Sequence, residues 1–296
     1  MKPVSRLLSA VAAIALAGVA LAEDASAPPF PLQNDLPEGW DMGGADMPID
    51  ILGVKLGMPR EQAVQVISAA LPIDPNSIVE SAQEKGIADQ YGTQVFFKYV
   101  YWWNAATVST GPSRDAIQLS FSTGISGERV TGMTRRTDWT SDLPRFPDME
   151  KALIEKYGPP TYAAPGPNSS VYYWGYYTGQ KFTIDDATAK KIDATADASG
   201  CLWNLNAVPT YDYEPEAQPG GPERRHFEKL KKDCNAVLMI RLTNDYDSQG
   251  LVRTMEVLLE GPKRINENFN ATDAFLDKAL ADAIANSSGG PSGPKL

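Results

Sequence analysis

Residues 234–260 constrain the fold of this chain most, because they have the pattern of a β-hairpin and a weaker copy of that pattern occurs earlier. The segment is an apolar stretch, a polar turn containing Gly250, and a second stretch with alternating apolar positions. Residues 117–133 follow the same plan. The matching positions are Val130 and Val252, and Met133 and Met255. The repetition predicts an α+β protein of two tandem units, each a helix packed on an antiparallel sheet.

The first unit is expected over residues 51–140. Pro59 suits a first helical position, since it lacks the N–H that has no helical partner there, and Pro72 ends the apolar stripe that follows. The residues after this helix, 73–90, have the composition of a loop with at most one helical turn. The expected strands are residues 93–103, 117–122 and 128–137.

The second unit is expected over residues 141–285. Its helix begins at Pro147 and ends at Gly158, and strands follow at 170–178 and 180–184. A long insertion, residues 185–233, then separates these strands from the closing hairpin. A final helix over 272–285, capped by Asn270 or Thr272, precedes a tail at 286–296 that we expect to be disordered.

The first 22 residues have the pattern of a cleaved secretory signal: a short basic start, an apolar run and small residues at the end. A retained anchor is the alternative, although the run is short for a bilayer span. Residues 23–50 follow as a flexible lead-in. We therefore expect a periplasmic or secreted protein with no membrane span after signal removal. In that setting Cys201 and Cys234 predict a disulfide, with two reduced thiols as the alternative.

The formal net charge of −10, without a basic run, argues against nucleic acid and anionic membranes as partners. Proteins, glycans and small molecules remain as classes of partner.

The segment 53–61, GVKLGMPRE, with the apolar helix and antiparallel strands after it, resembles the SmpA/OmlA outer-membrane assembly lipoproteins. The tandem arrangement is similar to the secreted β-lactamase inhibitor proteins. That resemblance implies two helix-plus-sheet repeats that form an aromatic-rich concave surface. The chain departs from these families in having Pro59 where a Ser or Thr cap is usual, in lacking a lipid-bearing Cys, and in its insertion.

One motif has the spacing of a metal site: Asp245, Asp247, Gln249 and Glu256 match ligand positions of an EF-hand calcium loop. The flanking residues alternate like strands rather than helices, and a polar β-turn explains the same residues. We therefore expect no metal and no cofactor.

Other polar residues have simpler structural explanations than catalysis. His226 lies in a charged helical stretch, Ser126 in a turn, and Asp185 and Asp186 at a helix start. These residues match no familiar catalytic motif.

The remaining signal is the excess of aromatic residues in two strands. Burial in a core explains such rings, but a strand with large rings on both faces exposes some of them unless both faces are covered. In the first strand Phe96 and Trp102 alternate with residues of the opposite face, and they share their face with Gln94 and Lys98. The predicted binding surface consists of Phe96, Trp102, Tyr172, Trp174 and Tyr176.

These features predict an exported, non-enzymatic binding or envelope-accessory protein that recognises an envelope or extracellular protein through an aromatic sheet surface. The alternative is a glycan-binding or cell-wall-binding protein, or a hydrolase of such material that uses a carboxylate pair not recognisable from sequence.

Overall fold

The computed structural model of the chain describes residues 49–88, 94–108, 111–177, 180–182, 234–245 and 250–288. These residues contain the helices α1 (Arg60–Ala70), α2 (Phe146–Tyr157) and α6 (Pro262–Ser288). Two short 3₁₀ turns, η1 (Pro75–Ser77) and η2 (Gly124–Ser126), connect other elements. The signal-like residues 1–22, the predicted lead-in 23–50 except its last two residues, and the whole predicted insertion 185–233 lie outside the described residues.

Nine strands complete the structure. They are β1 (Val79–Ala88), β2 (Gln94–Ala106), β3 (Ser113–Phe121), β4 (Val130–Trp139), β5 (Tyr162–Ala164), β6 (Ser169–Tyr177), β7 (Gln180–Lys181), β8 (Cys234–Asn244) and β9 (Val252–Glu260). Both hairpins predicted from the repeated pattern are confirmed, as β3–β4 and β8–β9.

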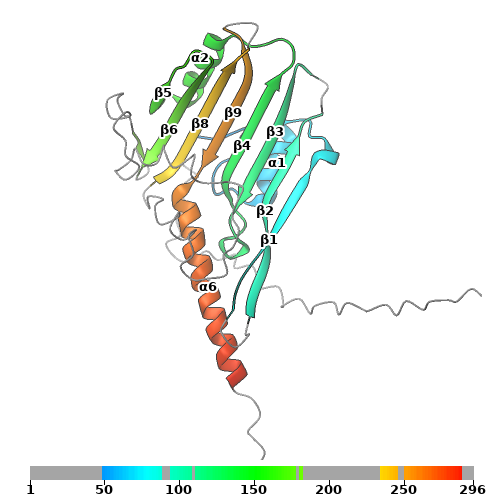
Figure 1. The fold of residues 1–296 in the computed structure, drawn as a ribbon, viewed down its shortest axis with the longest axis vertical. Coiled ribbons are helices and arrows are strands. Elements are labelled where there is room, and N and C mark those ends of the chain that lie inside the picture. Colours follow the sequence, from blue (N-terminus) through cyan, green and yellow to red (C-terminus); the bar gives the residue numbers. More distant parts are fainter. Residues whose placement is uncertain are drawn as a thin grey trace, which may run out of the picture.

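All strands belong to one sheet in the order β1-β2-β3-β4-β9-β8-β6-β5, with β7 paired to β6. Each neighbouring pair is antiparallel, so the predicted α+β class with an antiparallel sheet is confirmed. The two halves of the chain meet at the centre of the sheet, where β4 lies beside β9 (Figure 1).

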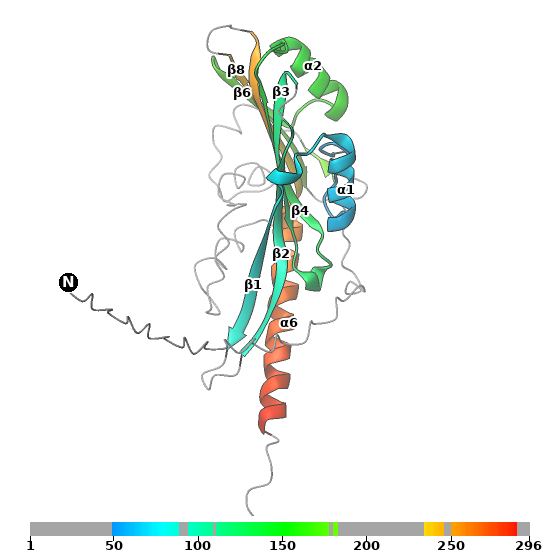
Figure 2. The same cartoon turned by 90° about the vertical axis from the view of Figure 1, so that its right-hand side faces the viewer.

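Helices α1 and α2 cover the same face of the sheet (Figure 2), which we call the helix face. The main core lies beneath them. One row of this core crosses six neighbouring strands, and each member is at most 1% exposed: Trp103, Leu119, Met133, Leu259, Leu238 and Trp174. Burial of such large apolar side chains is the main stabilisation of the sheet.

Two elements were missed by the sequence patterns. Residues 79–88 form β1, although residues 73–90 were expected to be loop, because the segment VESAQEKGIA has no apolar alternation and becomes a strand through its pairing with β2. The three-residue strand β5 is likewise held by pairing with β6. Pairing with a neighbouring strand outweighs weak local preference in both cases.

The final helix begins at Pro262, ten residues before the predicted start, so neither Asn270 nor Thr272 caps it. Its first turns lack a long apolar stripe and are fixed by tertiary contacts instead. The side-chain oxygen of Asn268 accepts hydrogen bonds from the backbone N–H and the hydroxyl of Thr123, both at 3.0 Å. Thr272 is fully buried in the same contact, and α6 leads away from the end of β9 (Figure 1).

The pairing of β1 with β2 shifts between Ser81 and Ala82, which face Trp102 and Val100. Tyr101 is therefore an extra residue in β2, and regular alternation of faces stops there. Consistent with this, Val100 packs against the same core as Trp103 although the two are three positions apart. Simple alternation would place Val100 and Trp102 on one face, but the extra residue between them puts them on opposite faces.

Candidate functional site

The face of the sheet opposite α1 and α2, which we call the open face, carries a different set of side chains. Where the helix face has the row Trp103, Leu119 and Met133, the next row of the open face has Asn104, Gln118 and Thr134. Polar side chains thus lie at the centre of this face, and beside them Val237 and Met239, with Leu258 packed against them, belong to a second, smaller buried apolar cluster. This face is where the structure can present groups to a ligand.

A hollow of about 630 Å³ lies on the open face and spans β2, β3, β4, β9 and β8. Its lining includes small, neutral polar and apolar residues; those used below are Ala116, Gln118, Thr134, Met239 and Leu258. The charged residues Arg136, Glu256 and Glu260 border it as well; Arg135 also contributes to the lining, but its side chain meets Asp115 on the helix face. The volume is within the range of ligand-binding pockets in proteins.

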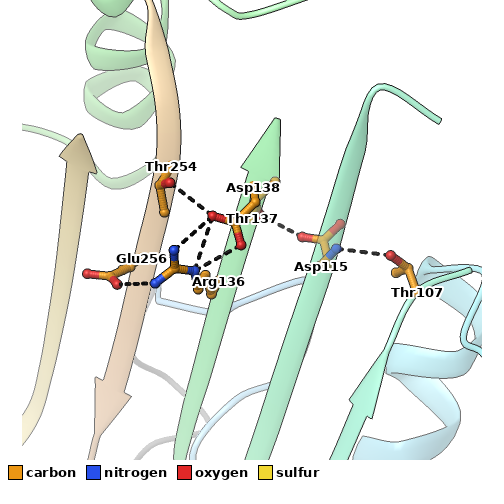
Figure 3. Close-up of polar contacts among 7 residues, drawn as sticks. All are labelled: Thr107, Asp115, Arg136, Thr137, Asp138, Thr254 and Glu256. Carbon is orange, nitrogen blue, oxygen red and sulfur yellow. Dashed lines mark hydrogen bonds and ion pairs between the residues drawn. The ribbon is translucent and has the colours of Figure 1, made fainter. Parts of the chain in front are cut away.

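A ladder of alternating charges crosses the open face along one side of the hollow (Figure 3). The guanidinium of Arg136 donates to both oxygens of Asp138, with the Nε to Oδ2 distance at 2.9 Å, and Nη1 donates to Glu256 at 3.1 Å. Glu256 also accepts from Arg241 at 3.0 Å, and Thr254 donates to Asp138 at 2.9 Å. The hydrogen bond from Arg136 is the main reason that the pKa of Asp138 lies below its ordinary value.

The other end of the hollow is bordered by Glu260, the last residue of β9, which is 1% exposed. Neither oxygen of its carboxyl group has a hydrogen-bond partner in the part of the chain that the structure describes. Removal from water raises its pKa from 4.5 to about 8, so the carboxyl group is mostly protonated at neutral pH. Its neighbours across the sheet are Gly132 on β4 and Val237 on β8.

Gly132 leaves room beside this carboxyl group. A Cβ added to Gly132 would stand 3.7 Å from the Glu260 Cγ and 3.9 Å from the Ser120 Cβ. The space next to Glu260 therefore depends on a residue without a side chain.

Asp115 on the helix face is also buried, yet one oxygen of its carboxyl group, Oδ1, accepts two hydrogen bonds. Arg135 Nε donates to it at 2.7 Å and the hydroxyl of Thr137 at 2.6 Å. The hydroxyl of Thr107 accepts from the backbone N–H of Asp115 at 2.9 Å (Figure 3). This cluster links β2, β3 and β4 beneath the helices and is a structural one.

The structure contradicts the predicted exposure of Tyr172, Trp174 and Tyr176, because they lie on the helix face and are at most 4% exposed. Trp174 donates its indole N–H to the carbonyl of Gly158 at 2.8 Å, and its ring centroid lies 5.4 Å from that of Tyr157 at the end of α2. The hydroxyl of Tyr172 donates to Glu150 of α2 at 3.0 Å. These rings are core, since α2 covers the side of β6 from which they project.

The two remaining aromatic residues of the predicted surface lie on β2. Trp102 is partly buried on the open face, in the same row as Ser120, Gly132 and Glu260. The backbone of Phe96 pairs with Gly86, but its side chain lies outside the described part of the structure. Of the residues predicted to form the aromatic surface, Trp102 is the one that the structure places on the open face, which carries the hollow.

The four proposed calcium ligands are only partly described, since Asp247 and Gln249 lie outside the described residues. Glu256, the last position of the motif, is held by Arg136 and Arg241 on the sheet. A carboxylate that already neutralises two guanidinium groups is a poor calcium ligand. Among the described residues no group of three or more acidic, His or Cys side chains is placed to hold a metal ion.

Of the two cysteines, Cys201 lies outside the described residues and Cys234 begins β8 as a buried residue. The Cys201–Cys234 disulfide stays a prediction. His226, Asp185 and Asp186 also fall outside the described part, whereas Ser126 lies in η2 and is fully buried.

Sequence reasoning missed Glu260, Arg136 and Arg241. The available signal was the alternation in 252–260, which places Glu256 and Glu260 on one face with Leu258 between them. An acidic residue ending an otherwise apolar strand gives no sign of burial on its own. Its neighbours in the structure, Gly132 on β4 and Val237 on β8, are distant in sequence.

No helix in the described ranges is both long enough and apolar enough to cross a bilayer. Comparison of the chain with protein-family profiles, with curated proteins and with solved structures found no match.

Proposed function

We propose that the protein is a non-enzymatic binding module that recognises a protein partner through the hollow on the open face of its sheet. The observation that carries this proposal is the hollow itself, about 630 Å³ in volume and bordered by ordered charges. It takes the place of the aromatic surface expected from the sequence, because most of those rings are core.

The chemistry of the open face suits recognition. Neutral polar groups from Gln118 and Thr134 lie beside the apolar side chains of Met239 and Leu258 around one hollow. Mixed surfaces of this kind offer hydrogen bonds for orientation and apolar area for affinity. The charge ladder holds its side chains in place through cross-strand ion pairs, so little ordering remains to be done on binding.

We further propose that the chain consists of two tandem units, the arrangement that the resemblance to β-lactamase inhibitor proteins implies. Arg135 follows Val130 by five positions, and Val257 follows Val252 by five. Arg135 and Val257 pair directly with each other at the middle of the β4–β9 ladder. Arg135 and Val257 thus hold equivalent positions in the two copies of the motif. A two-fold axis that relates the copies would pass between two such residues, and their direct pairing therefore supports duplication.

We also propose that the protein acts outside the cytoplasm, in the periplasm or after secretion. The signal-like pattern of residues 1–22 and the even number of cysteines support this location. An envelope or extracellular protein is then the partner class.

The alternative function is hydrolysis of a glycan or of cell-wall material by two carboxylates. Glu256 and Glu260 both border the hollow, and the raised pKa of Glu260 is what a general acid requires. However, they stand four residues apart on one strand, roughly 13 Å between Cα atoms. Glu256 is also neutralised by two guanidinium groups, which makes it a weak base or nucleophile. Binding is therefore the better-supported function.

The test is selection of binding sequences from a random-peptide display library on the whole protein, followed by a matched pair of variants. Ala116 is exposed and lines the hollow, whereas Ala152 is exposed on α2 on the opposite side of the sheet. Ala116→Arg should weaken the selected peptides about tenfold or more by filling the hollow, and Ala152→Arg should leave their affinity unchanged.

Equal affinity of both variants for every selected peptide would place the binding surface elsewhere and refute the proposal. Release of soluble sugar fragments from purified peptidoglycan by wild type, lost in Glu260→Gln, would support the hydrolase instead.

A further inference from the structure

We infer that Glu260 receives a protonated primary amine, the lysine side chain of a partner protein, at its end of the hollow. This inference rests on the proposed function and specifies the ligand chemistry of the same site. Its basis is a hollow that is bordered by a buried carboxyl group with both oxygens unused.

A buried carboxyl group without partners is costly, so its persistence needs an explanation. Among the described residues no group donates to it, and neither Gly132 nor Val237, its neighbours on the adjacent strands, has a side-chain donor. The two oxygens together provide acceptor positions for an ammonium group, which carries three N–H donors.

Charge balance favours a cation over a neutral ligand. The other charged residues that border the hollow are paired: Arg135 with Asp115, and Arg136 with Glu256. Glu260 forms no hydrogen bond, and its raised pKa comes from burial without any contribution from a neighbouring charge. The formal net charge of −10 adds a field that attracts cations.

The charged groups on the surrounding elements do not occupy this position. On β4 and β8 the nearest charges of the same face are Arg136 and Arg241, each four residues from the neighbours of Glu260, or roughly 13 Å along the strand. On β9 Glu256 is bound to both of them. On α6 Lys263 pairs with Glu267, and Arg264 is buried with interactions of its own.

A lysine side chain fits better than a compact cation because of the apolar lining. Leu258 stands between Glu256 and Glu260 on β9, and Met239 pairs with it from β8. These side chains can cover the aliphatic stem of a lysine while its ammonium group reaches Glu260. A hydrated metal ion would gain nothing from them.

Binding then releases a proton. The free carboxyl group is mostly protonated at pH 7, and it must ionise to pair with an ammonium group, whose own proton stays in place. The proton leaves to solvent, so the bound state holds one proton fewer. Affinity should rise with pH, by up to about tenfold per unit, and level off above pH 8, the pKa of the free group.

The experiment uses the whole protein and Nα-acetyl-lysine amide as the probe, followed by NMR titration at pH 6, 7 and 8. We expect the probe to shift the backbone amides of Val237 and Gly261. Its affinity should rise about tenfold from pH 6 to 7 and about fivefold from pH 7 to 8, where half of the free groups are already ionised. The same compound acetylated at Nε keeps the stem and loses the charge, and it should bind at least about tenfold more weakly.

Glu260→Gln should abolish both the affinity for the lysine probe and its pH dependence. Glu155→Gln, on the exposed surface of α2, is the matched control and should retain both. Equal binding of the probe to wild type and Glu260→Gln, or an absence of binding to wild type at pH 8, would overturn the inference. An affinity that falls as the pH rises through 8 would also overturn it. That result would mean that the carboxyl group binds in its protonated form and donates a hydrogen bond to a neutral ligand.

The two proposals fail separately. If selected peptides are lost in Ala116→Arg but lysine contributes nothing through Glu260, the hollow is a binding site with a different ligand chemistry. If the lysine probe binds at Glu260 while no peptide is affected by Ala116→Arg, the ammonium site stands and the proposed partner surface does not.

Discussion

Asp115 and Glu260 are both buried carboxyl groups of one sheet, on opposite faces, and their surroundings differ in one respect. Asp115 accepts hydrogen bonds from Arg135 and Thr137, whereas neither oxygen of Glu260 accepts any. The fold offsets the cost of burying Asp115 with its own groups and leaves that of Glu260 uncompensated. The buried acid under the helices stabilises the structure, whereas the buried acid on the open face is the one for which we propose a ligand.

The largest expected effect separates the two faces at neighbouring residues of β2. Trp103 is 1% exposed in the core row, so Trp103→Ala should lower the free energy of unfolding by about 3–5 kcal/mol. Trp102 is only partly buried on the open face, and Trp102→Ala should cost less than about 2 kcal/mol. Urea denaturation of both variants measures the difference. Equal costs would mean that both faces contribute equally to the core.

The second prediction concerns Glu260, whose substitution should raise the free energy of unfolding at pH 7 rather than lower it. Its pKa is higher in the folded protein than the ordinary 4.5 of the unfolded chain, so the folded state holds an extra proton between pH 4.5 and about 8. Its contribution to stability is therefore complete below pH 4.5 and is lost as the pH rises, by about 1.4 kcal/mol per unit. Glu260→Gln lacks this loss and should be more stable than wild type at pH 7, by at most about 3 kcal/mol.

Denaturation at pH 4.5 and pH 7 tests this prediction, with Glu155→Gln as the exposed control. The stability that Glu260→Gln gains over wild type should be larger at pH 7 than at pH 4.5. An equal gain at both pH values would show that the carboxyl group of the folded wild type is ionised at both.

Asp115→Asn makes the same change at the other buried acid, since it also replaces a carboxyl group with an amide. The variant leaves the guanidinium of Arg135, 19% exposed, facing a neutral amide, and we expect a loss of about 2 kcal/mol. Asp277→Asn on the exposed side of α6 is the control and should have almost no effect. If Asp115→Asn and Glu260→Gln both stabilised the protein at pH 7, the distinction between engaged and unengaged acids would be lost.

The smallest effect is expected in the charge ladder. Glu256 is paired with Arg136 and Arg241, but all three side chains are about a third or more exposed, so Glu256→Gln should cost less than about 1 kcal/mol. Its effect should shrink in high salt, as measured by thermal denaturation at low and high ionic strength. A loss above 2 kcal/mol that salt does not change would identify the ladder as part of the core.

Local sequence patterns were sufficient for most elements. Pro59 and Gly158 mark the start of α1 and the end of α2, and the repeated alternation identifies the hairpins β3–β4 and β8–β9. The patterns failed for β1 and for the first ten residues of α6, where partners distant in sequence decide the conformation.

Burial could not be assigned in the same way. Alternation identifies which residues of a strand share a face but not which face the helices cover, so Trp174 and Tyr172 were expected outside and lie inside. An extra residue such as Tyr101 shifts the alternation without a sequence signal.

The sequence by itself determined the α+β class and the hairpins of this protein, because helix and strand periodicities, prolines and glycines act within a few residues. Only the tertiary structure decided which carboxyl groups have partners. Asp115 meets Arg135 and Thr137 because β3 pairs with β4, and Glu260 ends between Gly132 and Val237 because β9 pairs with β4 and β8. The pKa of a buried acid depends on water and charge within a few ångströms, which is set by strands distant in sequence.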